Sequence, residues 1–421
     1  MKKVNQIAIL EGLDDLLEEC FNYSEIKTKI EITGQGNSIS NIRNSRLFST
    51  PHAIYGYKYK SNKVVTWNFR SNAPGDVFAT DNCGILKNSI SGKNAEDRMQ
   101  IAVNDKKSII AFFGGSTMMS MGAVTPNFSI PSLVEKILAQ KYNKKAVCIN
   151  FGLGGTCCRE AFQVYLNEIK LKGRQANIVF YDGWNCSSYL THKKSMQMKL
   201  NDITSNYVTD SDAMLSIRHN IKLNKVYDFG WHLKSVFSLI FAYLTNGIQK
   251  FLPNFLGLIL LRIQSRLFPL DQSHKETSQL LNLTLTGENS FNSISEKAVD
   301  EYVAIHQAIK NLAIPRTGYM WIQQPLVFWG NKTLTSNERM WRENGYSSGD
   351  PQIFRSFDNH LKSKISNTPD LFSNYVDMTN VFDEVSEEVF IDSGHLNRLG
   401  NLIVSARIAN EIYTKQMEFG L

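Results

Sequence analysis

The chain has 421 residues, which exceeds a typical single domain, so one large domain with additions, or two domains, is expected. A hydrophobic fraction of 43% and a charged fraction of 20% are typical of globular proteins and exclude an intrinsically disordered chain. The net charge of +7 is spread along the sequence without a dense basic block, so we expect no nucleic-acid partner.

Residues 1–105 are expected to form an N-terminal flanking module. The first 30 residues predict one amphipathic helix, from four apolar residues at helical spacing: Ile7, Leu10, Leu13 and Leu17. Acidic residues from Glu11 onward interrupt the apolar run too early for a signal peptide, so a cytoplasmic location is expected. Residues 31–105 are rich in Asn, Ser, Gly and Lys and predict short strands and loops.

Residues 106–421 alternate between predicted strands and helices. Nearly continuous apolar runs, typical of strands buried on both faces, lie at 108–113, 146–150, 176–181, 319–324 and 375–377. Helical patterns lie at 132–142, 156–170, 294–312, 353–365 and 398–413. The spacing of Ser293 and Glu296 predicts a capping box at the start of the third of these helices. The alternation predicts a doubly wound, three-layer α/β/α fold around a mostly parallel central sheet of about five strands.

Three of the predicted strands run directly into turns that contain glycine. The first turn reads GGST and contains Ser116, the second reads GLGG and ends at Gly155, and the third reads GWN and ends at Asn185. Far downstream, the segment DSGH places Asp392 three residues before His395. Ligands of parallel sheets lie outside the carboxyl ends of the strands, so these groups could meet there. A serine, a histidine and an aspartate are the parts of a nucleophile, its base and its orienter.

These blocks resemble, in order and placement, those of the SGNH (GDSL-like) hydrolase superfamily, in the bacterial subgroup whose first block reads GGST. The resemblance covers roughly residues 108–185 and 294–415. It implies a flavodoxin-like SGNH hydrolase fold and acyl transfer through an acyl-serine intermediate, with no metal and no cofactor. It assigns Ser116 as the nucleophile, His395 as the base and Asp392 as the residue that orients this base.

The resemblance also implies an oxyanion hole. Its donors would be the backbone N–H groups of Ser116 and Gly155 and the side-chain amide of Asn185, with Gly154 as the register alternative to Gly155. Such donors stabilise the charge that develops on the substrate oxygen. Three further residues of these turns are candidates for substrate binding: Gly115, Gly154 and Trp184.

Some features of the sequence leave the substrate geometry open. Many relatives carry Asp where Gly115 and Cys186 stand here, and Trp184 could line a substrate pocket or belong to the core. The six cysteines contain no CxxC pair, so metal-ligand spacing is absent and reduced, mostly buried thiols are expected. A dinucleotide-binding turn at Gly152 is disfavoured, because Cys157 occupies the place of the third glycine.

Residues 187–293 interrupt the alternation with a largely helical, apolar insertion. Its uncharged runs, 235–249 and 251–261, are each shorter than the roughly 20 residues that a membrane-spanning helix needs. Three interpretations stay open: a helical cap over the active site, an interfacial helix pair over 235–268 that touches the inner face of the membrane, and a dimer contact.

The expected function is a serine esterase that acts on a carbohydrate O-acetyl or other small acyl ester, linked to bacterial surface polysaccharide metabolism. The acyl group and its carrier are inferred by analogy with the subgroup, not from the residues. The alternatives are an acyltransferase that uses the same serine, a lipase or thioesterase with a membrane-interfacial cap, and a catalytically inactive member that acts as a binding or assembly factor.

Overall fold

The computed structural model describes residues 8–21, 37–39, 49–52, 56–67, 76–191, 288–313, 317–344 and 351–421. Its centre is a five-stranded sheet in which every neighbouring pair of strands is parallel. The strands are β6 (Ser108–Gly114), β7 (Ala146–Asn150), β8 (Asn177–Asp182), β9 (Tyr319–Gln323) and β10 (Tyr375–Asp377). The strands β6 to β9 are buried along almost their whole length, which explains why the sequence shows them as nearly continuous apolar runs. In the short edge strand β10 only Val376 is buried.

The strand order in this sheet is β10-β9-β8-β6-β7. The chain therefore begins near one edge, adds β7 on one side of β6, and then adds β8, β9 and β10 on the other side. This is the flavodoxin-like doubly wound order, in which the direction of winding reverses between β6 and β8. The predicted fold class, three-layer α/β/α around five parallel strands, is confirmed.

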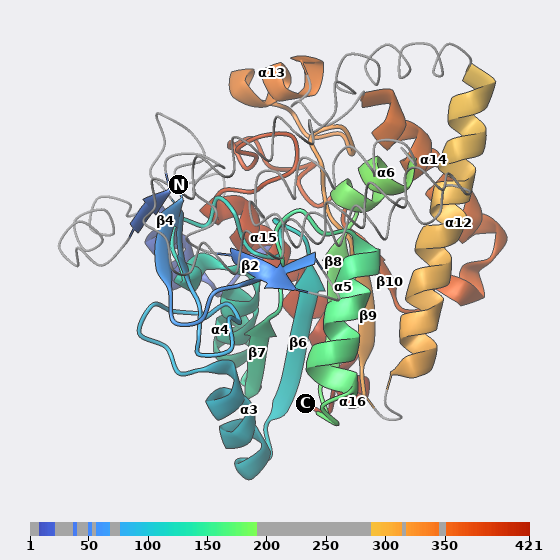
Figure 1. Ribbon diagram of the computed structural model, residues 1–421. Coiled ribbons are helices and arrows are strands. Elements are labelled where there is room, and N and C mark those ends of the chain that lie inside the picture. Colours follow the sequence, from blue (N-terminus) through green and yellow to red (C-terminus); the bar gives the residue numbers. More distant parts are fainter. Residues whose placement is uncertain are drawn as a thin grey trace, which may run out of the picture.

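Helices cover both faces of the sheet (Figure 1). On one face, α4 (Ile130–Tyr142) and α15 (Arg398–Thr414) pack against each other and against the apolar side chains of the sheet. On the other face lie α5 (Cys158–Tyr165), α12 (Glu288–Leu312) and α14 (Pro351–Asn367). Each face has its own hydrophobic core, so the sheet is shielded from water on both sides.

The N-terminal elements contact the main domain. A 3-10 turn, η2 (Ala8–Leu10), and the helix α1 (Asp14–Phe21) place apolar residues in the same core as α4 and α15. The predicted helix over 1–30 is thus shorter in the described residues, because Gly12 at φ +77° separates the two elements. The division of the chain at residue 105 stays a prediction.

Between α1 and β6, short strands form two small sheets. The strands β1 (Asn37–Ile39), β4 (Val64–Trp67) and β5 (Asp76–Ala79) form one, while β2 (Ser49–His52) pairs with β3 (Gly56–Tyr59). The prediction of strands and loops over 31–105 misses one helix, α3 (Ala95–Asn104), whose buried residues pack in the core shared with α5. Its polar composition hides the short apolar stripe that the helix buries.

The remaining helices show where the sequence pattern is weak. The helix α12 begins at Glu288, so Ser293 lies inside the helix and not at the N-cap position that is predicted for it. The short helices α6 (Trp184–Thr191), α13 (Ser336–Asn344) and α16 (Gln416–Phe419), the 3-10 turns η4 (Pro126–Phe128) and η6 (Pro369–Phe372), and the π-helical turn η5 (Leu166–Lys170) complete the described elements. The η5 turn continues α5 to the end predicted for that helix.

Most of the predicted insertion, from 192 to 287, lies outside the described residues, and with it the cap, membrane and dimer interpretations. Among the helices that the structure describes, none combines the length and apolar character needed to cross a bilayer.

Candidate active site

Three side chains that are far apart in the sequence form a chain of hydrogen bonds at the carboxyl ends of the strands. Nε2 of His395 lies 2.7 Å from Oγ of Ser116, and Nδ1 of the same ring lies 2.7 Å from Oδ2 of Asp392. An ionised carboxylate only accepts, so Nδ1 of His395 carries the proton and Nε2 presents its lone pair to the serine hydroxyl. This is the geometry that a serine nucleophile and its base require.

The loop that carries His395 and Asp392 is held rigidly just before α15. Oδ1 of Asp392 accepts hydrogen bonds from the backbone N–H groups of Gly394, at 2.9 Å, and His395, at 2.8 Å. Burial raises the pKa of Asp392, but the neighbouring His395 and these hydrogen bonds outweigh burial, so the net pKa lies below its ordinary value. Asp392 is thus ionised at neutral pH although it is fully buried.

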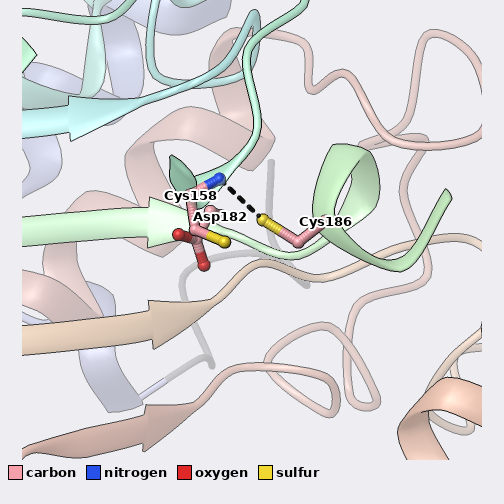
Figure 2. Close-up of side chains that lie close together, drawn as sticks. All are labelled: Cys158, Asp182 and Cys186. Carbon is pink, nitrogen blue, oxygen red and sulfur yellow. Dashed lines mark hydrogen bonds between the residues drawn. The ribbon is translucent and has the colours of Figure 1, made fainter. Parts of the chain in front are cut away.

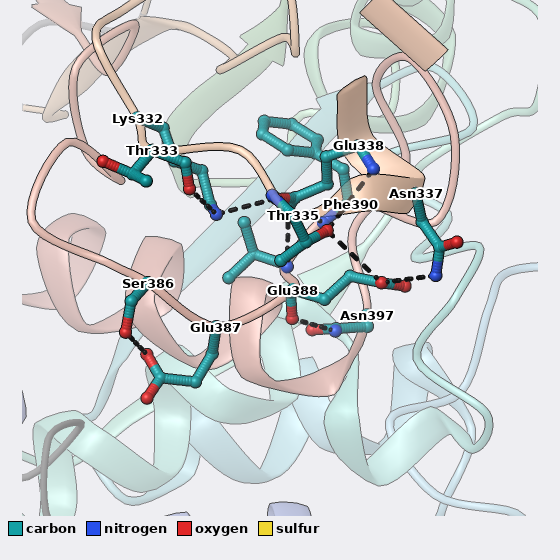
Figure 3. A network of polar contacts seen from close by, with 11 residues as sticks. Lys332, Thr333, Thr335, Asn337, Glu338, Ser386, Glu387, Glu388, Phe390 and Asn397 are labelled. Atoms are coloured by element: carbon teal, nitrogen blue, oxygen red, sulfur yellow. Dashed lines mark hydrogen bonds and ion pairs between the residues drawn. The ribbon is translucent and has the colours of Figure 1, made fainter. Parts of the chain in front are cut away.

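A second carboxylate, that of Glu338, holds the backbone of this loop. Oε1 of Glu338 accepts the N–H groups of Val389 (2.9 Å) and Phe390 (3.2 Å), while its Oε2 accepts from Lys332 and from the N–H of Thr335 (Figure 3). Glu338 and Lys332 are an ion pair 2.8 Å long with side chains that are 0% and 3% exposed. The segment just before Asp392 is therefore held in place by one buried carboxylate, that of Glu338 on α13.

The three glycine turns open to solvent only at the predicted residues. Ser116, Gly155 and Asn185 are partly exposed, whereas the residues directly beside each of them in the turns are buried. Ser116 follows β6 and Asn185 follows β8, and these neighbouring strands flank the point where the winding reverses. Ligands of doubly wound sheets bind at this point, so the turns stand where the fold offers a site.

The backbone donors of the predicted oxyanion hole are available for a ligand. Within the described part of the chain, the N–H groups of Ser116 and Gly155 have no hydrogen-bond acceptor. Gly154 differs, because its N–H donates to the hydroxyl of Tyr59 at 2.9 Å. Of the two register alternatives, Gly155 is therefore the one with a free donor. Its φ of +72° turns the backbone in a way that favours glycine.

Asn185 points its amide toward the same turns. One hydrogen of Nδ2 is donated to the carbonyl of Thr156 at 2.8 Å, which leaves the second hydrogen free to donate. A Cβ atom on Gly115 would lie 2.6 Å from this Nδ2 and 2.8 Å from the carbonyl of Thr156. Gly115 is thus required for the close approach of Asn185 to this turn.

Trp184 contacts the histidine and is buried. Its ring meets that of His395 with centroids 4.9 Å apart in an edge-to-face arrangement, and it packs against the backbone of Gly394. Between the two interpretations of Trp184, the structure places it in the core beside the site. Cys186 is fully buried, and its Sγ accepts a hydrogen bond from the backbone N–H of Cys158 at 3.0 Å.

Sequence reasoning misses three residues that support this site: Tyr59, Asp76 and Glu338. Tyr59 contacts the second turn, and Glu338 holds the histidine loop. Oδ2 and Oδ1 of Asp76 accept the N–H groups of Gly122 and Val124, in the loop after Ser116, at 2.9 and 2.8 Å. The one available signal is a carboxylate in an otherwise apolar strand, Asp76 at the start of β5.

Comparison with solved structures finds proteins of similar fold. A lipase/acylhydrolase from Enterococcus faecalis is 10% identical, with 73% of this chain and 96% of that chain covered and a TM-score of 0.33. An acetyl xylan esterase from Geobacillus stearothermophilus is 11% identical, with 72% and 94% covered and a TM-score of 0.35. A two-domain esterase active on acetylated mannans is 11% identical, with 78% and 57% covered and a TM-score of 0.32.

No protein-family model matches the sequence, and the search of curated proteins gave no match. At identities near a tenth and TM-scores near one third, the structural likeness carries no argument about the reaction. What the site can do rests on its own geometry.

Proposed function

We propose that this protein is a serine ester hydrolase of the SGNH type, with Ser116 as the nucleophile. The observation that carries the proposal is the unbroken hydrogen-bond chain from Oγ of Ser116 through the ring of His395 to the buried carboxylate of Asp392. A serine hydroxyl is a weak nucleophile unless a base removes its proton, and the lone pair of Nε2 is directed at that proton.

The reaction follows from these positions. Oγ of Ser116 attacks the ester carbonyl while Nε2 of His395 takes the hydroxyl proton, and Asp392 stabilises the imidazolium that forms. The N–H groups of Ser116 and Gly155 and the free hydrogen of Asn185 donate to the oxyanion. His395 then gives its proton to the departing alkoxide, and the acyl group stays on Ser116. Water, deprotonated by His395, attacks the acyl-serine. The bond between the acyl carbon and Oγ then breaks as His395 returns the proton to Oγ, which releases the carboxylic acid and restores Ser116.

The substrate proposed is an acetyl or other small acyl ester of a carbohydrate, in bacterial surface polysaccharide metabolism. This assignment is supported by the GGST form of the first block and by the DSGH segment, which resemble the subgroup with such roles. The acetylated xylan and mannan named for two of the structural neighbours are the polymers to assay first.

The test is hydrolysis of p-nitrophenyl acetate, butyrate and octanoate by the full chain and by two variants, Ser116→Ala and His395→Ala. We expect activity in the wild type, a preference for acetate, and a loss of about 10³-fold or more in kcat in both variants. A fluorophosphonate probe should label the wild type on the peptide that contains Ser116. Ser91→Ala, which removes an exposed serine hydroxyl elsewhere, serves as the matched control and should stay fully active.

If the folded wild type hydrolyses none of these esters and is not labelled at Ser116, the proposal is wrong and a binding or assembly role takes its place. If the acyl group is transferred to an added acceptor sugar faster than to water, the same serine serves an acyltransferase. A preference for octanoate over acetate would contradict the small acyl group.

A further inference from the structure

A second cluster of reactive side chains lies behind the oxyanion turns and has no part in the proposed reaction. Cys158 begins α5, Asp182 ends β8, and Cys186 stands in the first turn of α6 (Figure 2). One ligand atom from each, the two sulfurs and a carboxylate oxygen, lie within 4.8 Å of one another. All three residues are buried, the most exposed being Asp182 at 3%.

Within the described residues, only some of the polar atoms around this cluster make hydrogen bonds. Oδ1 of Asp182 accepts a hydrogen bond from the hydroxyl of Tyr302, but Oδ2 makes no hydrogen bond within the residues that the structure describes. Nε2 of His306 is likewise without a hydrogen bond there, although it lies 3.2 Å from this Oδ2. Buried polar atoms normally have partners, so two such atoms side by side require an explanation.

The hydrogen bonds of His306 indicate which of its ring nitrogens carries the proton. The hydroxyl of Tyr319 donates to the backbone carbonyl of His306, so it accepts from Nδ1 of the ring, 2.8 Å away. In the neutral ring Nδ1 then holds the proton, and Nε2 carries a lone pair. This lone pair faces the lone pairs of Oδ2 of Asp182. A proton on Nε2 would join these two atoms as an ion pair 3.2 Å long, and a metal cation could take the same electron pairs. The thiols of Cys158 and Cys186 lie within 4.8 Å of a carboxylate oxygen of Asp182 and add two more donors.

We infer that this cluster binds a thiophilic divalent cation, of which Zn²⁺ is the natural choice, through Cys158, Cys186 and Asp182. In a tetrahedral zinc site, sulfur donors lie about 3.8 Å apart and oxygen and nitrogen donors about 3.3 Å apart, from bonds of about 2.3 and 2.0 Å. The three ligand atoms of the cluster lie within 4.8 Å of one another, a separation from which they could close on one ion. His306 stands outside the 4.8 Å set, but its Nε2 lies 3.2 Å from Oδ2 of Asp182, which makes it the candidate for a fourth ligand.

The surroundings already orient these ligands. The backbone N–H of Cys158 donates to Sγ of Cys186 at 3.0 Å, the type of bond that stabilises a metal thiolate, and Tyr302 fixes the carboxylate of Asp182. Because a metal is bound by thiolates, binding of the cation would release the two thiol protons to solvent. Linear spacing could not reveal the site, because its ligands come from three separate elements.

The position gives the cation a structural role. It would join the start of α5, next to Gly155, to the start of α6, next to Asn185. Two of the three proposed oxyanion donors would then stand on segments tied to one ion. The test below does not depend on catalysis, so it can succeed or fail independently of the proposed function.

The test is the metal content of the full chain, expressed with added ZnCl₂ and then dialysed against EDTA. We expect about one zinc per chain, the stoichiometry of a single closed site. Cys186→Ser and Asp182→Asn should retain at most about a tenth of this, since each removes a ligand. Cys148→Ser is the matched control, because it changes another fully buried cysteine, on β7, and should bind as much zinc as the wild type.

A second measurement needs no variant. Wild-type protein expressed with CoCl₂ should show the near-ultraviolet thiolate-to-cobalt absorption and the intense visible bands of a tetrahedral thiolate site. Folded wild-type protein that carries no zinc after expression in ZnCl₂ and gives no cobalt–thiolate absorption would overturn the inference. Folded Cys186→Ser with full zinc content would overturn it as well.

Discussion

The hydroxyl of Tyr59 accepts a hydrogen bond from the backbone N–H of Gly154 at 2.9 Å, across 95 positions of sequence. The same hydroxyl donates to Sδ of Met119 at 3.0 Å, in the loop after Ser116. One tyrosine of the small hairpin therefore contacts two of the three turns that form the candidate site. The hydroxyl of Tyr59 also determines which glycine of the second turn has an N–H available for a ligand. It accepts the N–H of Gly154, so the N–H of Gly155 is the one that stays available.

Replacing Tyr59 by Phe should lower kcat for p-nitrophenyl acetate with little change in KM. The variant keeps the ring and loses the acceptor for Gly154 together with the weak hydrogen bond to Sδ of Met119. Loss of the bond to Gly154 should cost about 1 kcal/mol, or about fivefold in rate, because Gly155 is then less well positioned. Tyr165→Phe is the control, because its hydroxyl bonds to the carbonyl of Leu312, far from the serine. Equal kcat in Tyr59→Phe and wild type would show that Tyr59 does not position the turn.

Much of this fold could be predicted because the central strands are buried on both faces. A buried parallel strand is a nearly continuous apolar run, so β6 to β9 agree with the predicted strands to within one residue at either end. The candidate residues Ser116, Asn185, Asp392 and His395 are predicted in a different way, from the resemblance of their sequence blocks to a known family.

Residues that support the site could not be predicted in this way. Tyr59 and Asp76 act through hydrogen bonds to backbone N–H groups. Nearly every residue has such a group, so the sequence does not show which residues make these bonds. Glu338 lies on α13, a helix too polar to show an apolar stripe. The cluster of Cys158, Asp182 and Cys186 forms only when α5, β8 and α6 come together, so its spacing along the chain carries no pattern.

Asn185 should contribute to the rate and not to substrate affinity. Asn185→Ala removes the one side-chain donor to the oxyanion, and loss of such a donor typically costs about 2.7–4 kcal/mol, or about 10²–10³ in kcat. Because Nδ2 also bonds to the carbonyl of Thr156, the thermal midpoint of the variant must be measured beside its kinetics. A variant with a normal midpoint and a normal kcat would exclude Asn185 from the oxyanion hole.

Glu338→Gln should destabilise the fold. The change leaves the buried ammonium of Lys332 without its counter-charge, and breaking a buried pair in this way costs about 3–5 kcal/mol of unfolding free energy. The double variant Lys332→Met with Glu338→Gln should recover part of this loss, since no unpaired charge stays buried. Urea unfolding at neutral pH measures both variants, and a double variant no more stable than the single one would contradict the explanation.

The same carboxyl predicts a dependence on pH. Burial raises the pKa of Glu338, but Lys332 and three backbone N–H groups outweigh it, so the folded pKa lies below the ordinary value of 4.5. The stabilisation by Glu338 is therefore complete above the unfolded pKa and is lost as the pH falls through the folded one. The stability difference between wild type and Glu338→Gln should shrink below pH 4.5; a difference that stays constant down to pH 3 would contradict it.

For Asp76 we expect stability to change with pH in the opposite direction. Burial raises its pKa from 3.8 to about 6, against the N–H groups of Gly122 and Val124 and the nearby His395, while Asp392 adds to the rise. A folded pKa above the unfolded one means that the folded protein holds the proton more tightly. The contribution of Asp76 to stability is then greatest below pH 3.8 and is lost as the pH rises through about 6.

Comparison with Asp76→Asn isolates this effect, because all other carboxyl groups are common to both proteins. The variant cannot titrate at this position, and its weaker bonding to the two N–H groups adds an offset that does not depend on pH. The unfolding free energy of the wild type relative to Asp76→Asn should therefore fall by about 2 kcal/mol between pH 4 and pH 7, as expected for a pKa raised from 3.8 to about 6. Urea unfolding of both proteins across this range measures the difference. A flat difference would mean that Asp76 is charged in the folded protein throughout, with its two N–H bonds sufficient to offset its burial.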